Sequence, residues 1–219
     1  MTIRAVVFDF GGVLFDWSQH LYRKLIANDV ERQWFLDTIC TQDWNTEQDA
    51  GRSLAEATRT LVAQYPEHKT LIQAYYERWP EMLRAELPEG VAILEALHQV
   101  EMPLFGLTNW SAETFPYARA NYPFLKRFRD ILVSGEVKLI KPDPAIYHAS
   151  LSQVREHLPD IQASEVVFID DVAGNIDAAV ALGWQGIHHV SAERTAARLR
   201  ELGVSKMHLM GQPRRMPSM

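Results

Sequence analysis

The chain has 219 residues, of which 47% are hydrophobic and 23% are charged, and its net charge at pH 7 is −6. This composition predicts a globular protein with a full-sized core and excludes the strongly basic surface with which proteins bind nucleic acid. Cys40 is the only cysteine, so no internal disulfide can form, and no apolar run approaches the roughly 18 residues of a membrane-spanning helix. We therefore expect a cytoplasmic protein that binds a small molecule, with no nucleic-acid partner and no membrane partner.

Short runs of apolar or β-branched residues predict five buried strands. These runs are Ile3–Phe8, Pro103–Leu107, Asp130–Ser134, Val166–Ile169 and Gln185–Val190. Amphipathic helical patterns lie at Glu89–Val100, Pro144–Glu156, Asn175–Leu182 and Ala192–Leu202. Alternation of strands and helices is typical of the α/β class, and we expect a Rossmann-like parallel sheet core with helices on both faces.

Residues 17–87 break this alternation, because they carry helical patterns and no strand signal. Helices are expected there at Ser18–Asn28, Glu31–Ile39, Ser53–Gln64 and His68–Leu83. We expect residues 17–87 to form a helical cap subdomain, inserted in a core made of residues 1–16 and 88–210, with Trp34 and Trp79 in its interior. Residues 211–219 contain two prolines and two arginines without periodicity, which predicts a loose tail.

A polar stretch, Gln42–Ser53, separates two of the helices expected in this insert. Its Gly51 would allow a tight turn, and Arg52 is a candidate contact for an anion or a sugar. A solvated connection in which Ser53 caps the next helix accounts for the stretch equally well.

Polar and ionisable residues follow four of the predicted strands, at the positions where ligands bind in a parallel sheet. In chain order they are Asp9, Thr108 with Asn109, Lys138 with Lys141, and Asp170 with Asp171. Asn109 is a candidate substrate contact. Converging carboxylates repel one another, and a hard cation such as Mg²⁺ relieves that repulsion. A hydroxyl and an ammonium group would hold a phosphate, which leaves Asp9 free to attack phosphorus and form an aspartyl-phosphate. Each of these residues alone is more often a turn or cap residue; their order indicates phosphoryl chemistry.

Four segments resemble, in order, the motifs of the haloacid dehalogenase-like (HAD) hydrolases. They are F-D-F-G-G-V, L-T-N-W, S-G-E-V-K-L-I-K-P-D-P-A-I-Y and F-I-D-D-V-A-G-N, and the resemblance spans about residues 4–190. The resemblance implies that Asp9 is the nucleophile, that Thr108 and Lys141 bind the phosphate, and that Asp170 and Asp171 hold Mg²⁺. It also implies that the helical insert is a cap, which closes over the substrate and selects the leaving group.

Two glycines, Gly11 and Gly12, follow shortly after Asp9, and one of them departs from the pattern of the family. Gly11 and Gly12 let the backbone approach metal and phosphate closely, and in the family the carbonyl at Gly11 can be a metal ligand. Most family phosphatases carry a general acid and base at the position of Gly11. Asp16 and His20, near the start of the insert, are candidates for supplying the proton instead.

A subgroup of the family that resembles the bacterial α-glucose-1-phosphate phosphatase also lacks this acid. The sugar 1-phosphates on which that subgroup acts expel a better leaving group than an ordinary alkoxide. The sequence thus favours a Mg²⁺-dependent phosphatase that hydrolyses a small phosphorylated metabolite, with sugar phosphates as candidates. One alternative is a 2-haloacid dehalogenase that forms an aspartyl ester and needs no metal, and another is a non-catalytic protein that binds a sugar phosphate. The sequence does not indicate the oligomeric state, or which of Asp170 and Asp171 binds a metal directly.

Overall fold

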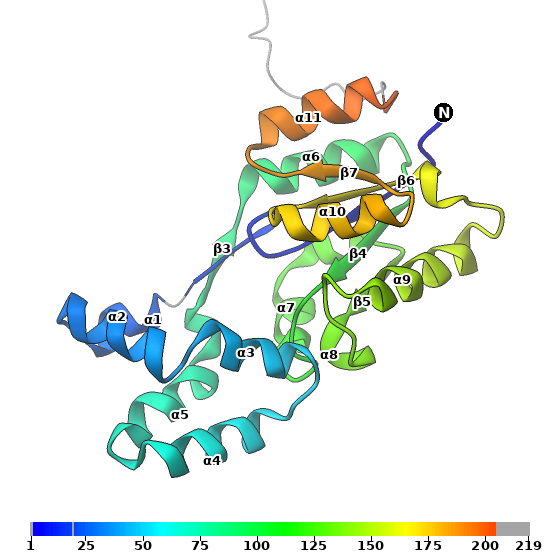
Figure 1. Ribbon diagram of the computed structural model, residues 1–219. Helices are drawn as coiled ribbons and strands as arrows, with labels where there is room; N and C mark the ends of the chain where they lie inside the picture. Colours follow the sequence, from blue (N-terminus) through cyan, green and yellow to red (C-terminus); the bar gives the residue numbers. More distant parts are fainter. Residues whose placement is uncertain (1, 19, 205–219) are drawn as a thin grey trace, which may run out of the picture.

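The computed structural model describes residues 2–18 and 20–204, and the tail predicted at residues 211–219 lies outside them (Figure 1). Its centre is a five-stranded sheet in the order β5-β4-β1-β6-β7, and every neighbouring pair of strands is parallel. The strands are β1 (Ala5–Phe8), β4 (Leu104–Thr108), β5 (Asp130–Val133), β6 (Val166–Asp170) and β7 (Gln185–His188). All five predicted strands are present, and their ends differ from the prediction by at most two residues.

Helices cover both faces of the sheet, and side chains on β1 alternate between the two faces. Val6 and Phe8 join one hydrophobic cluster, whereas Ala5 and Val7 join another. The first cluster contains side chains from α6 (Pro88–Gln99) and α11 (Ala192–Glu201). The second contains side chains from α9 (Pro144–His157) and α10 (Ala173–Ala181). Because a buried strand must be apolar on both faces, its sequence is a continuous apolar run. The structure confirms the predicted α/β fold (Figure 1).

Shorter helical segments complete the core. They are α7 (Phe115–Asn121), α8 (Ser134–Val137), η3 (Pro123–Arg127) and η4 (Ala163–Glu165), of which the last two are 3₁₀ helices. Of these, α8 matters for the site, because it follows β5 directly at the carboxyl edge of the sheet.

The helical insert, which is the segment between two short antiparallel strands, lies beyond the carboxyl edge of the sheet (Figure 1). These strands are β2 (Phe15–Trp17) and β3 (Leu83–Glu86). The expectation that residues 17–87 hold no strand is wrong for β3, because four residues paired with only one partner strand leave too short a pattern to stand out from the preceding helix. None of the described helices combines the length and the apolar character needed to cross a bilayer.

The helices of the insert are α1 (Leu21–Leu25), α2 (Asp29–Thr38), α3 (Gln42–Asp49), α4 (Leu54–Gln64), η1 (Pro66–His68), α5 (Lys69–Glu77) and η2 (Trp79–Glu81). The stretch predicted as a polar connection contains α3, whose N-cap Thr41 accepts a hydrogen bond from the backbone of Trp44 at 3.0 Å. Ser53 caps α4 as expected. Trp79 is buried, but Trp34 is 47% exposed, so its predicted place in the interior is wrong.

Candidate active site

Three of the predicted site residues meet where adjacent strands end. Asp9 follows β1 directly, Thr108 is the last residue of β4, and Asp170 is the last residue of β6. Because β1 lies between β4 and β6 in the sheet, these three positions are neighbours at the carboxyl edge. Asp9, Thr108 and Asp170 are all buried.

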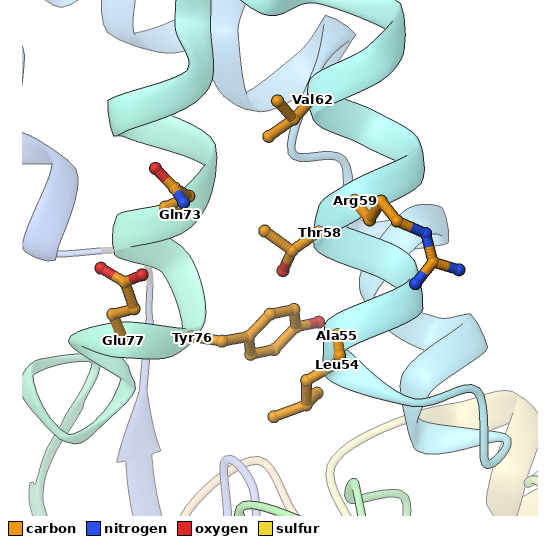
Figure 2. A pocket seen from close by; sticks show the side chains of 8 residues that line it. All are labelled: Leu54, Ala55, Thr58, Arg59, Val62, Gln73, Tyr76 and Glu77. Atoms are coloured by element: carbon orange, nitrogen blue, oxygen red, sulfur yellow. The ribbon is translucent and has the colours of Figure 1, made fainter.

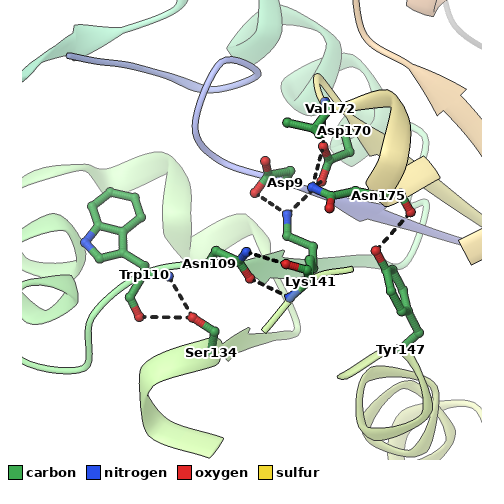
Figure 3. Close-up of polar contacts among 9 residues, drawn as sticks. All are labelled: Asp9, Asn109, Trp110, Ser134, Lys141, Tyr147, Asp170, Val172 and Asn175. Atoms are coloured by element: carbon green, nitrogen blue, oxygen red, sulfur yellow. Dashed lines mark hydrogen bonds and ion pairs between the residues drawn. The ribbon is translucent and has the colours of Figure 1, made fainter. Parts of the chain in front are cut away.

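Lys141 reaches this edge from the loop after α8 and joins two of the acids (Figure 3). Its Nζ lies 2.8 Å from Oδ1 of Asp9 and 2.7 Å from Oδ2 of Asp170. Its side chain is 1% exposed, so these ion pairs are shielded from water. Lys138, the other lysine in the motif, is exposed at the C-cap of α8. The structure therefore brings Lys141, and not Lys138, to the acids.

Asn109, predicted as a substrate contact, holds the backbone of Lys141 in place (Figure 3). Its side-chain amide donates to the carbonyl of Lys141 at 3.0 Å and accepts from the Lys141 N–H at 2.9 Å. Both functional groups of the amide are therefore used in positioning the lysine. A side chain that fixes the loop from both sides keeps the ammonium group aimed at the strand ends.

Asp170 is fixed by several donors, including a residue that the sequence reasoning did not assign to the site. The Nδ2 group of Asn175 lies 3.0 Å from each carboxylate oxygen of Asp170, and the N–H of Val172 donates to its Oδ1 at 2.8 Å. The hydroxyl of Tyr147 donates in turn to the carbonyl of Asn175 at 2.9 Å. Asn175 is in the first turn of α10, and its position five residues after Asp170 was the available signal.

Burial and neighbouring charges shift the pKa values of the ionisable groups in the site. Burial raises the pKa of Asp9 to about 7, with Lys141 opposing the shift and the charge of Asp170 adding to it. Burial by itself would lower the pKa of Lys141, but Asp9 and Asp170 outweigh it and the pKa is raised. The pKa of Asp171 is also raised, by burial and then by the charge of Asp170. One ammonium group thus faces three carboxylates, which is an excess of negative charge.

The same three carboxylates could hold a metal ion. Asp9, Asp170 and Asp171 each offer an oxygen, and these oxygens lie within 4.8 Å of one another. Gly12 has a φ of +65°, and a Cβ there would lie 2.1 Å from Oδ2 of Asp171. A residue with a Cβ would therefore be strained at this position and would collide with the Asp171 carboxylate, so the turn requires glycine. A Cβ at Gly11, by contrast, would meet no atom within 4 Å, so the space beside its backbone is open.

Arg52, the predicted anion contact in the insert, is engaged with side chains and backbone of α3. Its guanidinium forms an ion pair with Glu47, donates to Oε1 of Gln48 at 2.7 Å and donates to the carbonyl of Trp44 at 3.3 Å. The structure does not bring Arg52 into contact with the acids at the strand ends. Asp16 lies in β2 and His20 precedes α1, so both candidate proton donors are at the junction of core and insert.

A groove of about 540 Å³ opens between α4 and α5 of the insert (Figure 2). It is lined by Leu54, Ala55, Thr58, Arg59, Val62, Gln73, Tyr76 and Glu77. None of the acids at the strand ends lines it, so the groove is separate from the candidate active site.

Comparisons with known proteins agree with this architecture. A family model described as "Haloacid dehalogenase-like hydrolase" matches residues 6–188. A sesquiterpene phosphatase of Aspergillus oryzae is 27% identical over 201 residues, which are 92% of this chain and 97% of that protein.

Two solved structures with lower identity show the same fold. One is a HAD family enzyme from Bacteroides thetaiotaomicron in complex with magnesium and inorganic phosphate, with a TM-score of 0.60, 22% identity and coverage of 84% of this chain and 93% of that chain. The other is the L-2-haloacid dehalogenase from Xanthobacter autotrophicus, with a TM-score of 0.57, 18% identity and coverage of 91% and 83%.

Proposed function

The chain belongs to the haloacid dehalogenase-like hydrolases, and on this premise we propose that it is a Mg²⁺-dependent phosphatase acting on a small phosphorylated metabolite. The observation that carries the proposal is the cluster of Asp9, Asp170 and Asp171 around Lys141. The sesquiterpene phosphatase relative and the neighbour that binds magnesium and phosphate support the same chemistry. Because the phosphatase relative is named for a sesquiterpene, isoprenoid phosphates are a candidate substrate class beside sugar phosphates.

In the proposed reaction Asp9 is the nucleophile. A carboxylate oxygen of Asp9 bonds to phosphorus while the bond from phosphorus to the leaving oxygen breaks, which gives an aspartyl-phosphate. A water oxygen then bonds to phosphorus while the bond to Asp9 breaks, which restores the carboxylate and releases phosphate. Thr108 and Lys141 bind the phosphate oxygens and offset the negative charge that develops on them.

The donors at the strand ends fit a magnesium ion. Carboxylate and carbonyl oxygens are the ligands that Mg²⁺ prefers, and we expect Asp9, Asp170, Asp171 and the carbonyl of Gly11 to hold it, directly or through water. A bound Mg²⁺ would offset the charge of the three carboxylates and of the phosphate. Burial and the charge of Asp170 raise the pKa of Asp9, and a cation bound beside Asp9 would favour its ionised form.

The alternatives fit these observations less well. A dehalogenase needs an ionised Asp9 without a metal ion, yet burial and the charge of Asp170 both disfavour that charged form. A protein that binds a sugar phosphate without turnover could use Lys141 to hold the phosphate, but it would not need the Asp9 carboxylate beside that lysine, because this carboxylate repels a phosphate. The likeness to the haloacid dehalogenase is a likeness of fold.

The test is phosphate release from p-nitrophenyl phosphate, α-glucose 1-phosphate and farnesyl phosphate, each with Mg²⁺ and with EDTA. We expect metal-dependent hydrolysis of at least one ester, lost in Asp9→Asn. Chloride release from 2-chloropropionate in EDTA would instead support the dehalogenase. Tight binding of these esters without turnover would support the binding protein.

A further inference from the structure

The proposed reaction needs a proton for the leaving oxygen, and Gly11, at the position where the family usually has an acid, cannot give one. Gly11 has no side chain, and a Cβ built there meets no atom within 4 Å. An alkoxide is a poor leaving group, and a positioned acid typically accelerates its departure by about 10²–10⁴-fold. Another element must therefore bring an acid to this side of the site.

In-line attack fixes the direction from which that acid comes. The attacking and leaving oxygens lie on opposite sides of phosphorus, so a phosphate attacked by Asp9 points its leaving group away from the sheet. The helical insert lies in that direction, beyond the carboxyl edge (Figure 1). The acid is thus expected on the part of the insert that contacts the strand-end loops.

That part of the insert is the segment from the end of α3 to the start of α4, residues 49–54. Oγ of Ser134, the first residue of α8, donates to the carbonyl of Asp49 at 2.5 Å. The N–H of Leu54 donates to Oε1 of Glu113 at 2.8 Å. A Cβ at Gly51 would lie 3.3 Å from the carbonyl of Gly135. The segment is therefore packed directly on the loops after β4 and β5.

Asp49 is the only acid in this segment, and its carboxyl group is oriented from both sides. The backbone of Ser111, three residues after Thr108, hydrogen-bonds to the carboxyl group. From the insert, Nδ2 of Asn45 donates to Oδ2 of Asp49 at 3.1 Å. The hydroxyl of Tyr76 donates to Oδ1 of Asn45 at 3.0 Å and fixes that amide. Asp49 is thus held beside the loop that carries Thr108.

The environment of Asp49 also keeps a proton available near neutral pH. Burial raises the pKa of Asp49 to about 7, and the hydrogen bond from Ser111 partly opposes the shift. A carboxyl group with such a pKa can both give and take a proton under the same conditions.

We propose that Asp49, a residue of the helical insert, is the general acid and base that takes the place of the missing side chain at Gly11. The proposal rests on the phosphatase function proposed above. As Asp9 bonds to phosphorus and the leaving oxygen departs, the carboxyl proton of Asp49 passes to that oxygen, which leaves as an alcohol. The Asp49 carboxylate then takes a proton from the attacking water as its oxygen bonds to phosphorus and Asp9 is released.

The experiment compares two leaving groups of nearly the same shape in Asp49→Asn. Phenyl phosphate expels a phenol with a pKa of about 10, like that of tyrosine, whereas p-nitrophenyl phosphate expels a much more acidic phenol that needs little protonation. We expect the fall in kcat/KM to be at least about 10-fold larger for phenyl phosphate. Asp43→Asn makes the same charge change at an exposed position of α3 and is expected to affect neither ester.

A second variant separates proton transfer from a structural effect. Because the space at Gly11 is open, a carboxyl group fits there, and Gly11→Asp in the Asp49→Asn background is expected to restore hydrolysis of phenyl phosphate. Equal losses with both esters, or a loss that Gly11→Asp does not reverse, would overturn the role of Asp49 while leaving the phosphatase intact. Absence of hydrolysis by the wild-type protein would overturn the proposed function itself.

Discussion

The strand-end site and the helical insert hold their polar groups in different ways. At the strand ends, Lys141 and Asp170 are almost fully buried, and short contacts from several elements fix them. In the insert, the segment at residues 49–54 is joined to the core by hydrogen bonds, of which the one from Leu54 to Glu113 is exposed. The buried groups would hold the geometry of the proposed phosphoryl transfer, whereas an exposed contact like that between Leu54 and Glu113 competes with water and is more easily broken. This difference agrees with the proposal that the strand ends carry out the chemistry and that the insert contributes groups from outside the sheet.

The largest effect is expected from Asp9→Asn. The amide keeps the shape of the side chain but is a very poor nucleophile, and loss of a nucleophile commonly lowers kcat by at least about 10³-fold. Steady-state phosphate release with Mg²⁺ measures the loss. Residual activity within 10-fold of wild type would contradict nucleophilic attack by this residue.

Lys141→Met tests whether the buried ion pairs stabilise the core. The substitution leaves Asp9 and Asp170 without their cation, and removing one partner of a buried pair costs about 3–5 kcal/mol. The free energy of unfolding in urea with EDTA measures this cost, and added Mg²⁺ should recover part of it. Lys138→Met is the matched control at an exposed position, and an equal loss in both variants would argue against the assignment.

Gly12→Ala tests the link between the turn after β1 and the acid cluster. The new Cβ would collide with the Asp171 carboxylate and displace it, and loss of a correctly oriented ligand typically lowers metal affinity by about 10–100-fold. Titration of activity with Mg²⁺ reports the change. Gly174→Ala, where a Cβ meets no atom within 4 Å, should leave the titration unchanged. An unaltered Mg²⁺ dependence in Gly12→Ala would argue that Asp171 is not a metal ligand.

The smallest effect is expected at the exposed contact between insert and core. Glu113→Ala removes the acceptor of the Leu54 N–H, which water can replace, so the free energy of unfolding should fall by less than about 1 kcal/mol. Urea unfolding measures this value. A loss as large as that in Lys141→Met would show that the two regions are held with similar strength.

The sequence predicted the sheet and the position of the acids because both depend on local pattern. Five apolar runs marked the strands, and Asp9 and Asp170 follow two that are adjacent in space. The motif predicts Lys141 for the site, and the structure places its ammonium group against Asp9 and Asp170; its role in binding phosphate stays a prediction.

Other features depend on tertiary packing, which a local pattern does not record. Helix α3 is polar along most of its length, so its pattern favours a connection, although Thr41 is a recognisable N-cap. The engagement of Asn109 with Lys141, and of Arg52 with α3, follows from which loops pack together. The place of Asp49 beside Ser111 depends on how the insert folds back over residues far away in sequence.

The most direct test of the central claim is rapid acid quenching within the first turnover, with enzyme in excess over phosphate ester and Mg²⁺ present. Mass spectrometry of the peptide that contains Asp9 then identifies any covalent group on it. A phosphoryl group on Asp9, present with Mg²⁺ and absent with EDTA, is the predicted result. An unmodified Asp9 throughout a turnover that releases phosphate would contradict the account, as would an alkyl ester on Asp9 formed from 2-chloropropionate in EDTA.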